Sequence, residues 1–167
     1  MPTQVFRWVK ATLFILNAIS SLGELNAKLK ELVAYGTRVM AEKRLLFVED
    51  NSNQQALYKA LSKRFGFKAQ LVSNCREAMK ACQENEMYDL ILMDMSLEEI
   101  DGCQCTSMIR DLSAEGKNVP IVAVTGHVTN DYRVRCLESG MNDFLPKPFG
   151  IDDFGAILEK WTKNQPE

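Results

Sequence analysis

From residue 44 onward, short runs of consecutive apolar residues alternate with longer segments in which apolar residues recur every three or four positions. The short runs predict strands buried on both faces, and the longer segments predict amphipathic helices. Strands are expected at residues 45–48, 67–72, 90–93, 119–124 and 143–145. Helices are expected at residues 51–65, 74–85, 101–112, 130–139 and 151–162, with a polar loop at residues 113–118.

Five strand–helix units in succession predict an α/β protein with a parallel sheet. We expect a flavodoxin-like (βα)5 three-layer sandwich with strand order 2-1-3-4-5. The second strand is expected nearer an edge, because Lys68 and Gln70 interrupt its apolar run, and Gly66 and Gly140 are expected to end helices. The predicted apolar face of the first helix comprises Ala56, Leu57, Ala60, Leu61 and Phe65, and that of the last comprises Phe154, Ile157, Leu158 and Trp161.

Residues 1–43 precede this domain, which we place at residues 44–167. Apolar residues at alternating steps of three and four form an a/d seam, at Trp8, Ala11, Ile15, Ala18, Leu22, Leu25, Leu29 and Leu32. The seam predicts an N-terminal amphipathic helix that either forms a homodimer or binds a partner, or folds back on its own domain. The apolar run at residues 12–19 is too short for a span of roughly 20 residues, so neither a membrane span nor a signal peptide is expected.

The 167-residue composition is ordinary for a soluble globular protein, with 46% hydrophobic and 25% charged residues. A net charge of −2 gives no argument for nucleic-acid binding. The five cysteines contain no CxxC pair, and a single histidine makes a zinc site a poor explanation. We therefore expect reduced thiols and a cytoplasmic location.

Polar residues follow four of the five predicted strands: Glu49 and Asp50, then Asp94, Thr125 and Lys147. In an open parallel sheet such residues meet in the crevice beyond the strand ends. Three crowded carboxylates need a proton or a cation, and their oxygens suit Mg²⁺. A lysine ammonium and a threonine hydroxyl would then hold phosphoryl oxygens, with the Asp94 carboxylate as nucleophile.

These residues resemble the motifs of a receiver domain of a two-component response regulator, in that family's order. The resemblance covers residues 44–167 and rests on the acidic pair in LFVEDN, on Asp94 in LMDM, on Gly102 eight residues later, on Thr125 in AVTG and on Lys147 in LPKPF. Each motif alone is weak, whereas five in register are specific. The local sequence around these motifs is most similar to that of receivers attached to hybrid sensor histidine kinases.

The resemblance implies a role for each matching residue. Asp94 would accept a phosphoryl group from a histidine kinase or a histidine phosphotransfer protein. Asp50, Asp94 and the backbone carbonyl of Ser96 would bind Mg²⁺ directly, and Glu49 partly through water. The Thr125 hydroxyl and the Lys147 ammonium would contact the phosphoryl group. Phe144 matches the family's aromatic switch position and would respond to phosphorylation.

Two positions depart from the family's pattern. Glu98 stands where the family usually has proline four residues after the acceptor, which puts the phosphorylation rate or the metal affinity in doubt. His127 stands two residues after Thr125, at a position that in the family tunes hydrolysis of the phosphoryl group. A solvated loop histidine is the simpler interpretation of His127.

The function we expect is that of a Mg²⁺-dependent phosphorelay receiver that switches protein–protein contacts, either alone or as part of a hybrid kinase. Such a module is a phosphoacceptor, not an enzyme with a separate substrate. The alternative is a scaffold or dimerisation module that uses the N-terminal helix independently of phosphorylation. A haloacid-dehalogenase-type hydrolase would need aspartate at position 96, where this chain has Ser96.

Overall fold

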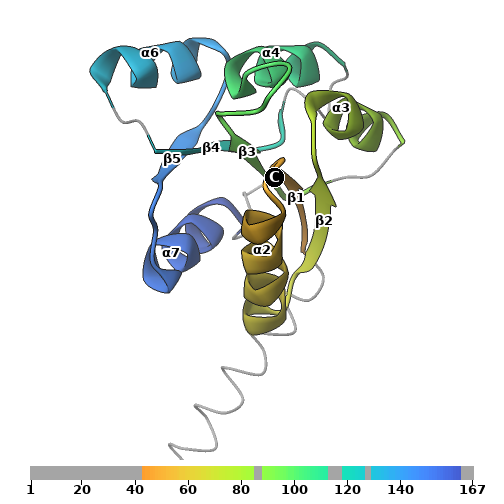
Figure 1. Ribbon diagram of the computed structural model, residues 1–167, viewed down its shortest axis with the longest axis vertical. Coiled ribbons are helices and arrows are strands. Elements are labelled where there is room, and N and C mark those ends of the chain that lie inside the picture. Colours follow the sequence, from red (N-terminus) through yellow and green to blue (C-terminus); the bar gives the residue numbers. More distant parts are fainter. Residues whose placement is uncertain (1–42, 85–87, 113–117, 127–128, 163–167) are drawn as a thin grey trace, which may run out of the picture. The chain divides into compact units, whose positions relative to one another are not determined.

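A computed structural model describes residues 43–84, 88–112, 118–126 and 129–162. Its centre is a five-stranded sheet (Figure 1). The strands are β1 (Arg44–Val48), β2 (Lys68–Val72), β3 (Leu90–Asp94), β4 (Ile121–Thr125) and β5 (Asp143–Pro146). The described helices are α2 (Ser52–Phe65), α3 (Cys75–Gln83), α4 (Gly102–Leu112), α6 (Asn130–Glu138) and α7 (Ile151–Thr162).

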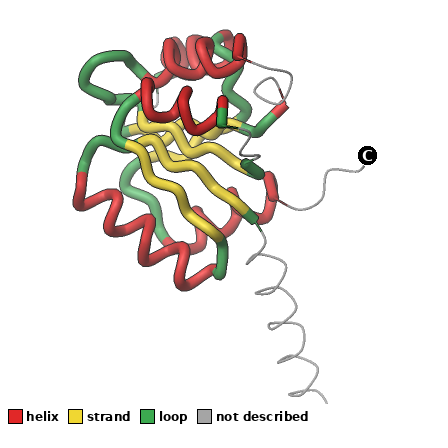
Figure 2. Tube along the Cα trace, turned by 90° about the vertical axis from the view of Figure 1, so that its right-hand side faces the viewer, coloured by secondary structure: helices red, strands yellow, loops and turns green. Residues whose placement is uncertain are grey.

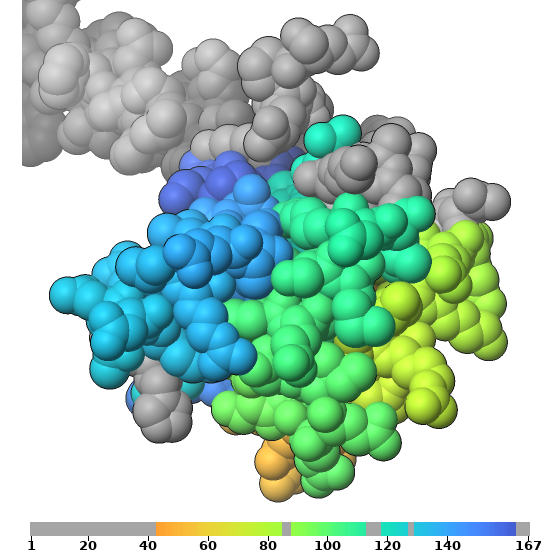
Figure 3. Space-filling model, turned by 90° about the horizontal axis from the view of Figure 1, so that it is seen from above, coloured from red at the N-terminus to blue at the C-terminus, as the bar shows by residue number. Residues whose placement is uncertain are grey.

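The sheet has the order β2-β1-β3-β4-β5, and every neighbouring pair is parallel. Helices α3, α4 and α6 cover one face, and α2 and α7 cover the other (Figures 1 and 2). Figure 3 looks onto the face that α3, α4 and α6 cover, with α4 between the other two helices. The predicted flavodoxin-like three-layer sandwich and its strand order are thus confirmed. The order places β1 and β3 side by side in the middle of the sheet, with β2 at one edge as expected.

The sheet separates two apolar clusters. One cluster lies between the sheet and α3, α4 and α6, and includes Ile91, Met93 and Ile109. The other lies under α2 and α7, where the Phe47 ring stacks on Tyr58 with ring centroids 4.4 Å apart. Because side chains alternate along a strand, the central strands feed both clusters and are buried along their whole length.

Local capping explains where the helices begin and end. Asn51 and Asn74 accept hydrogen bonds from backbone N–H groups in the first turns of α2 and α3. Gly66 ends α2 in the left-handed conformation with φ of 77°, and Gly140 follows α6 with φ of 94°. Predicted boundaries agree within two residues, including β4, which begins at Ile121 because Pro120 before it has no N–H to donate.

The predicted apolar face of α2 is wrong in part. Tyr58 and Leu61 are buried, whereas Leu57 is 42% exposed and Ala56 and Ala60 are exposed as well. The buried side of the helix is set by the Tyr58 ring, whose large apolar surface packs on Phe47. A face chosen without Tyr58 is therefore rotated away from the observed one.

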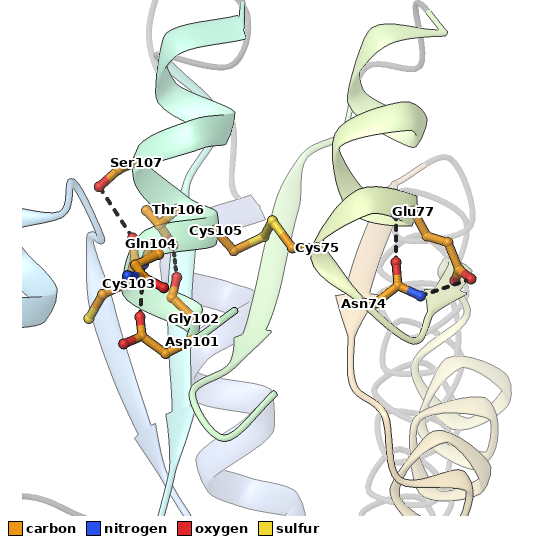
Figure 4. Close-up of a disulfide and its surroundings, with 10 residues drawn as sticks. All are labelled: Asn74, Cys75, Glu77, Asp101, Gly102, Cys103, Gln104, Cys105, Thr106 and Ser107. Atoms are coloured by element: carbon orange, nitrogen blue, oxygen red, sulfur yellow. Dashed lines mark hydrogen bonds between the residues drawn. A yellow bond between two sulfur atoms is a disulfide. The ribbon is translucent and has the colours of Figure 1, made fainter. Parts of the chain in front are cut away.

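The expectation of five reduced thiols is contradicted. Cys75 in the first turn of α3 forms a disulfide with Cys105 in α4, and their Cα atoms are 5.5 Å apart (Figure 4). Cys82, Cys103 and Cys136 are free thiols. The spacing of cysteines along the chain carries no information about this pair, because the sheet topology brings α3 and α4 together.

Some expectations fall outside the described residues. These are the N-terminal amphipathic helix within residues 1–43, most of the polar loop at residues 113–118, and His127. Within the part of the chain that the structure describes, no helix is both long enough and apolar enough to cross a bilayer.

Candidate functional site

Three carboxylates meet at the carboxyl edge of the sheet. β1 and β3 are paired with Val48 beside Met93, so Glu49 and Asp50 follow β1 next to Asp94 at the end of β3. One carboxylate oxygen from each of the three acids lies within 4.8 Å of the others. Glu49 is 1% exposed and Asp94 is 5% exposed, whereas Asp50 is half-buried. Asp50 therefore forms the accessible side of the cluster.

Lys147 supplies the positive charge of the site. It follows β5, and its ammonium lies 3.0 Å from Oε2 of Glu49 and 3.2 Å from Oδ1 of Asp94. Burial raises the pKa of Glu49; the hydrogen bond from Lys147 lowers it and the charge of Asp94 raises it, leaving the pKa above its ordinary value. One ammonium thus offsets only part of the negative charge that the fold concentrates here.

Backbone and amide donors hold the acids in place. The N–H of Asn51 donates to Glu49 Oε1 over 3.2 Å, and the N–H of Ser96 donates to Asp94 Oδ1 over 3.2 Å. The side-chain amide of Gln55 donates to the backbone carbonyl of Glu49 over 2.7 Å. The loops after β1 and β3 are therefore fixed by hydrogen bonds to the acids and to their backbone.

Gly102 lies against the backbone of Asp94. A Cβ atom at this position would be 2.6 Å from the Asp94 carbonyl oxygen and 2.8 Å from Met95 Sδ. Only glycine allows α4 to begin this close to the end of β3. The glycine eight residues after Asp94 thus has a packing reason.

Thr125 lies on β4, which is paired with β3, and Phe144 lies on the edge strand β5 next to β4. Thr125 is the last residue of β4 and is buried, and its backbone carbonyl accepts a 2.7 Å hydrogen bond from the N–H of Lys147. Phe144 in β5 is half-buried, and the Arg133 guanidinium of α6 lies 5.2 Å from its ring centroid. Thr125 is thus linked to Lys147, which directly follows β5, and Phe144 is linked to α6.

Asp50 also lines a cleft of about 620 Å³ between the loop after β3 and helix α3. The residues that line it include the acids Glu98 and Glu99 and the bases Arg76 and Lys80. Glu98 is exposed, so the side chain that replaces the family's usual proline adds negative charge near the accessible acid. Ser96, between Asp94 and this loop, is exposed as well.

The donor set fits magnesium. Glu49, Asp50 and Asp94 offer hard carboxylate oxygens, with no thiol or imidazole among the atoms of this cluster. Mg²⁺ prefers such ligands and keeps part of its water shell, which the half-buried Asp50 allows.

Sequence reasoning missed several residues around the site. The side-chain amide of Gln55 holds the backbone of Glu49. Burial, together with the charges of Glu49 and Asp94, raises the pKa of the Tyr58 hydroxyl. Tyr132 in the first turn of α6 is half-buried, and burial raises the pKa of its hydroxyl while the side chain of Thr125 lowers it in part. Their only sequence signal is position, within the first two turns of a helix that follows a site-bearing strand, which is too common to single them out.

Comparisons with known proteins agree with this geometry. The family model described as the response regulator receiver domain matches residues 45–159. The receiver domain of sensor histidine kinase PA1611 from Pseudomonas aeruginosa, with a magnesium ion coordinated in its active-site cleft, is 37% identical with a TM-score of 0.66. That match covers 72% of this chain and 97% of the solved one.

Full-length relatives place the same module in different proteins. Two-component response regulator 24 of Arabidopsis thaliana is 35% identical over 123 residues, which are 72% of this chain and 86% of that protein. Transcription factor SKN7 of Saccharomyces cerevisiae is 36% identical over 121 residues, but the chain spans only 19% of its length. With a family model that matches most of the chain and a relative matched over most of its own length, the chain belongs to the response regulator receiver domain family.

Proposed function

We propose that Asp94 is the phosphoacceptor of this two-component receiver and takes its phosphoryl group from a phosphohistidine. The observation that carries the assignment is the place of Asp94, a buried carboxylate at the end of the central strand β3 with Lys147 3.2 Å away. In the transfer, a carboxylate oxygen of Asp94 attacks phosphorus. The P–O bond of an acyl phosphate forms as the P–N bond of the donor breaks.

The other residues of the site receive roles that follow from their chemistry. Glu49, Asp50, Asp94 and the backbone carbonyl of Ser96 would hold Mg²⁺, which supplies positive charge next to the phosphoryl oxygens. The Lys147 ammonium would leave Glu49 and pair with a phosphoryl oxygen, and the Thr125 hydroxyl would donate to another. Phe144 would respond to this movement of Lys147, because β5, which contains Phe144, connects α6 to Lys147.

The phosphodonor protein is proposed to dock on α2. The exposed face of this helix carries Ala56, Leu57 and Ala60, and the helix begins two residues after Asp50. An apolar stripe beside a charged pocket suits a partner helix that presents a phosphohistidine. The donor is then a histidine kinase or a histidine phosphotransfer protein.

The output surface is proposed to be α6 with its neighbour β5. Val134 and Leu137 are 53% and 54% exposed and lie three residues apart on one side of α6. The same helix contacts Phe144 through Arg133. A shift at the phosphoryl group would thus reach an apolar surface suited to protein–protein contact. This role requires neither a separate substrate nor a nucleic acid. We propose that the protein acts in the cytoplasm.

Residues 1–43 are proposed to be a separate N-terminal helix and connector that joins two copies through the seam from Trp8 to Leu32. The seam's a/d spacing supports this dimer. Light scattering on the whole chain, compared with the variant Leu22→Asp/Leu29→Asp, tests it. The proposal expects a dimer that becomes a monomer in the variant, and a monomeric parent chain would refute it.

The test of Asp94 is intact mass after incubation with Mg²⁺ and acetyl phosphate. Wild type should gain ~80 Da, the mass of one phosphoryl group, and Asp94→Asn should gain nothing. Asp89→Asn is the matched control, because Asp89 is an acid just before the other end of β3 and pairs with Lys43. An adduct that persists in Asp94→Asn would assign the acceptor elsewhere, and its absence from wild type would favour the phosphorylation-independent scaffold.

A further inference from the structure

Gln55 links the loops that follow β1 and β2. Its side-chain amide nitrogen lies 2.7 Å from the backbone carbonyl oxygen of Glu49 and 3.1 Å from Oγ of Ser73. Its backbone N–H donates to the carbonyl oxygen of Asn51 over 3.0 Å, in the first turn of α2. The half-buried side chain thus joins the acidic pair to the neighbouring loop. We call this two-point link the Gln55 clamp.

The orientation of the amide in the clamp follows from its partners. A backbone carbonyl oxygen only accepts hydrogen bonds, so the amide nitrogen, and not the amide oxygen, must face Glu49. The nitrogen carries two protons, and the structure offers one acceptor for each, the Glu49 carbonyl oxygen and Ser73 Oγ. The amide is therefore held in one direction by both of its ends.

The Ser73 end of the clamp is anchored by the start of α3. The N–H of Ser73 donates to Glu77 Oε2 over 2.8 Å. The side chain of Asn74 accepts from the N–H of Glu77 over 2.9 Å and donates to Glu77 Oε1 over 3.1 Å (Figure 4). Reciprocal hydrogen bonds of this kind hold a helix N-terminus in one arrangement. Ser73 therefore offers Gln55 an acceptor whose own backbone is held in place.

The Glu49 end of the clamp determines where Asp50 lies. The N–H of Glu49 donates to the carbonyl oxygen of Val72 over 3.0 Å, so both backbone polar groups of Glu49 are held. The carbonyl group of Glu49 and the N–H of Asp50 belong to one planar peptide group. By fixing that plane, Gln55 fixes the point from which the half-buried Asp50 reaches the cluster of carboxylates.

We propose that Gln55 is a positioning residue for Mg²⁺, which holds the Asp50 carboxylate at the separation from Asp94 that this small ion requires. The proposal deepens the function above and rests on it. Gln55 does not itself bind the ion and acts only through the peptide group between Glu49 and Asp50. Mg²⁺ demands near-ideal octahedral geometry, whereas Ca²⁺ accepts variable distances and ligand numbers. Loss of the clamp should therefore weaken binding of Mg²⁺ more than binding of Ca²⁺.

The experiment measures the dissociation constants of Mg²⁺ and Ca²⁺ for the whole chain by calorimetric titration. Gln55→Met keeps the length of the side chain and removes both donors. Binding of Mg²⁺ should weaken about 3- to 10-fold, as for loss of one hydrogen bond, and binding of Ca²⁺ by less than about 2-fold. The NMR signal of the Asp50 amide should shift in the variant, because its peptide group loses a hydrogen bond. Thermal unfolding checks that each variant is folded.

Gln54→Met is the matched control. Gln54 is the same residue type one position earlier and is also half-buried, and its backbone N–H donates to the side chain of Asn51. Binding of both ions should stay at the wild-type level in this variant. Gln55→Met with wild-type Mg²⁺ affinity, with equal losses for the two ions, or with an unshifted Asp50 amide overturns the positioning role. The assignment of Asp94 then stands, because acetyl phosphate tests it separately. A wild-type chain that binds no Mg²⁺ overturns both.

Discussion

Lys147 Nζ lies 3.0 Å from Oε2 of Glu49, a buried carboxylate 98 residues earlier in the chain. The same ammonium reaches Asp94, so one cation serves two acids that the fold takes out of water. Such a pair is costly to break from one side, because the partner left behind is a buried, uncompensated charge. The site thus stores electrostatic repulsion that Mg²⁺ or a proton relieves.

Lys147→Met should lower the free energy of unfolding at pH 7 by about 1–3 kcal/mol, the cost of leaving a buried charged group unpaired. Added Mg²⁺ should restore much of the loss, since it binds the acids that the lysine no longer neutralises. Urea unfolding with and without Mg²⁺ measures both effects. Lys160→Met is the control: the exposed Lys160 ammonium pairs with the half-buried Asp143, and this pair should contribute at most about 1 kcal/mol. Equal, Mg²⁺-insensitive losses in the two variants would contradict this account.

Glu49 also predicts the sign of a pH dependence. Its pKa is raised in the folded chain, mainly by burial, so the folded state holds more protons than the unfolded state. Stability contributed by the neutral acid is fully present below the ordinary pKa of 4.5 and is lost as pH rises through the higher folded pKa. Glu49→Gln should therefore stabilise the metal-free chain at pH 7, by roughly 0.5–2 kcal/mol, and flatten this part of the pH profile.

The free energy of unfolding of wild type and of Glu49→Gln, measured between pH 4 and pH 8 in the presence of a chelator, tests this prediction. Asp143→Asn is the contrasting variant. The pKa of Asp143 is raised by burial but lowered overall by its hydrogen bonds from Lys160 and Trp161. Its contribution is present above the unfolded pKa and falls only in acid. A wild-type chain that gains stability steadily from pH 5 to pH 8, like its Glu49→Gln variant, would disprove the repulsion argued for the site.

Gly102→Ala should disturb the acceptor strand. The new Cβ would lie 2.6 Å from the Asp94 carbonyl oxygen, so α4 or the end of β3 must shift. We expect a loss of about 1–3 kcal/mol in stability, typical of overpacking, together with weaker Mg²⁺ binding. Gly126→Ala is the control, because a Cβ there meets nothing within 4 Å. Calorimetric titration with Mg²⁺ and urea unfolding would show both changes, and a Gly102→Ala chain that matches Gly126→Ala would rule out the steric argument.

The sequence predicts the site better than it predicts the surfaces. The acids, Thr125 and Lys147 follow strands of a parallel sheet, and that topology alone brings strand ends to one edge. The face of α2 is harder, because Tyr58 is both polar and large, and packing on Phe47 decides which side is buried. Tyr132 and the Cys75–Cys105 bridge depend on how helices sit above the sheet, which local spacing does not encode.

The exposed stripe on α2 predicts a defect confined to protein phosphodonors. Leu57→Glu should slow transfer from a phosphorylated histidine phosphotransfer protein about 10-fold or more, as for loss of an apolar anchor in an interface. The rate of phosphorylation by acetyl phosphate should stay unchanged, because Leu57 is exposed and lies outside the cluster of Glu49, Asp50 and Asp94. Leu137→Glu on α6 is the matched control and should slow neither reaction. Equal slowing with both donors in Leu57→Glu would place the defect in the site and not in docking.

The bridge between Cys75 and Cys105 predicts redox-dependent stability. It joins α3 to α4 across a sequence separation of 30, and on the chain-entropy model a closed loop of this size stabilises the fold by about 3–4 kcal/mol. Reductant should therefore lower the urea midpoint of the wild-type chain but not that of Cys75→Ala/Cys105→Ala, while Cys82→Ala should respond like wild type. Alkylation of the unfolded, unreduced chain should label Cys82, Cys103 and Cys136 alone. If all five cysteines are labelled and reductant has no effect, the two helices are held by packing only, and the thiols are reduced as the sequence by itself suggests.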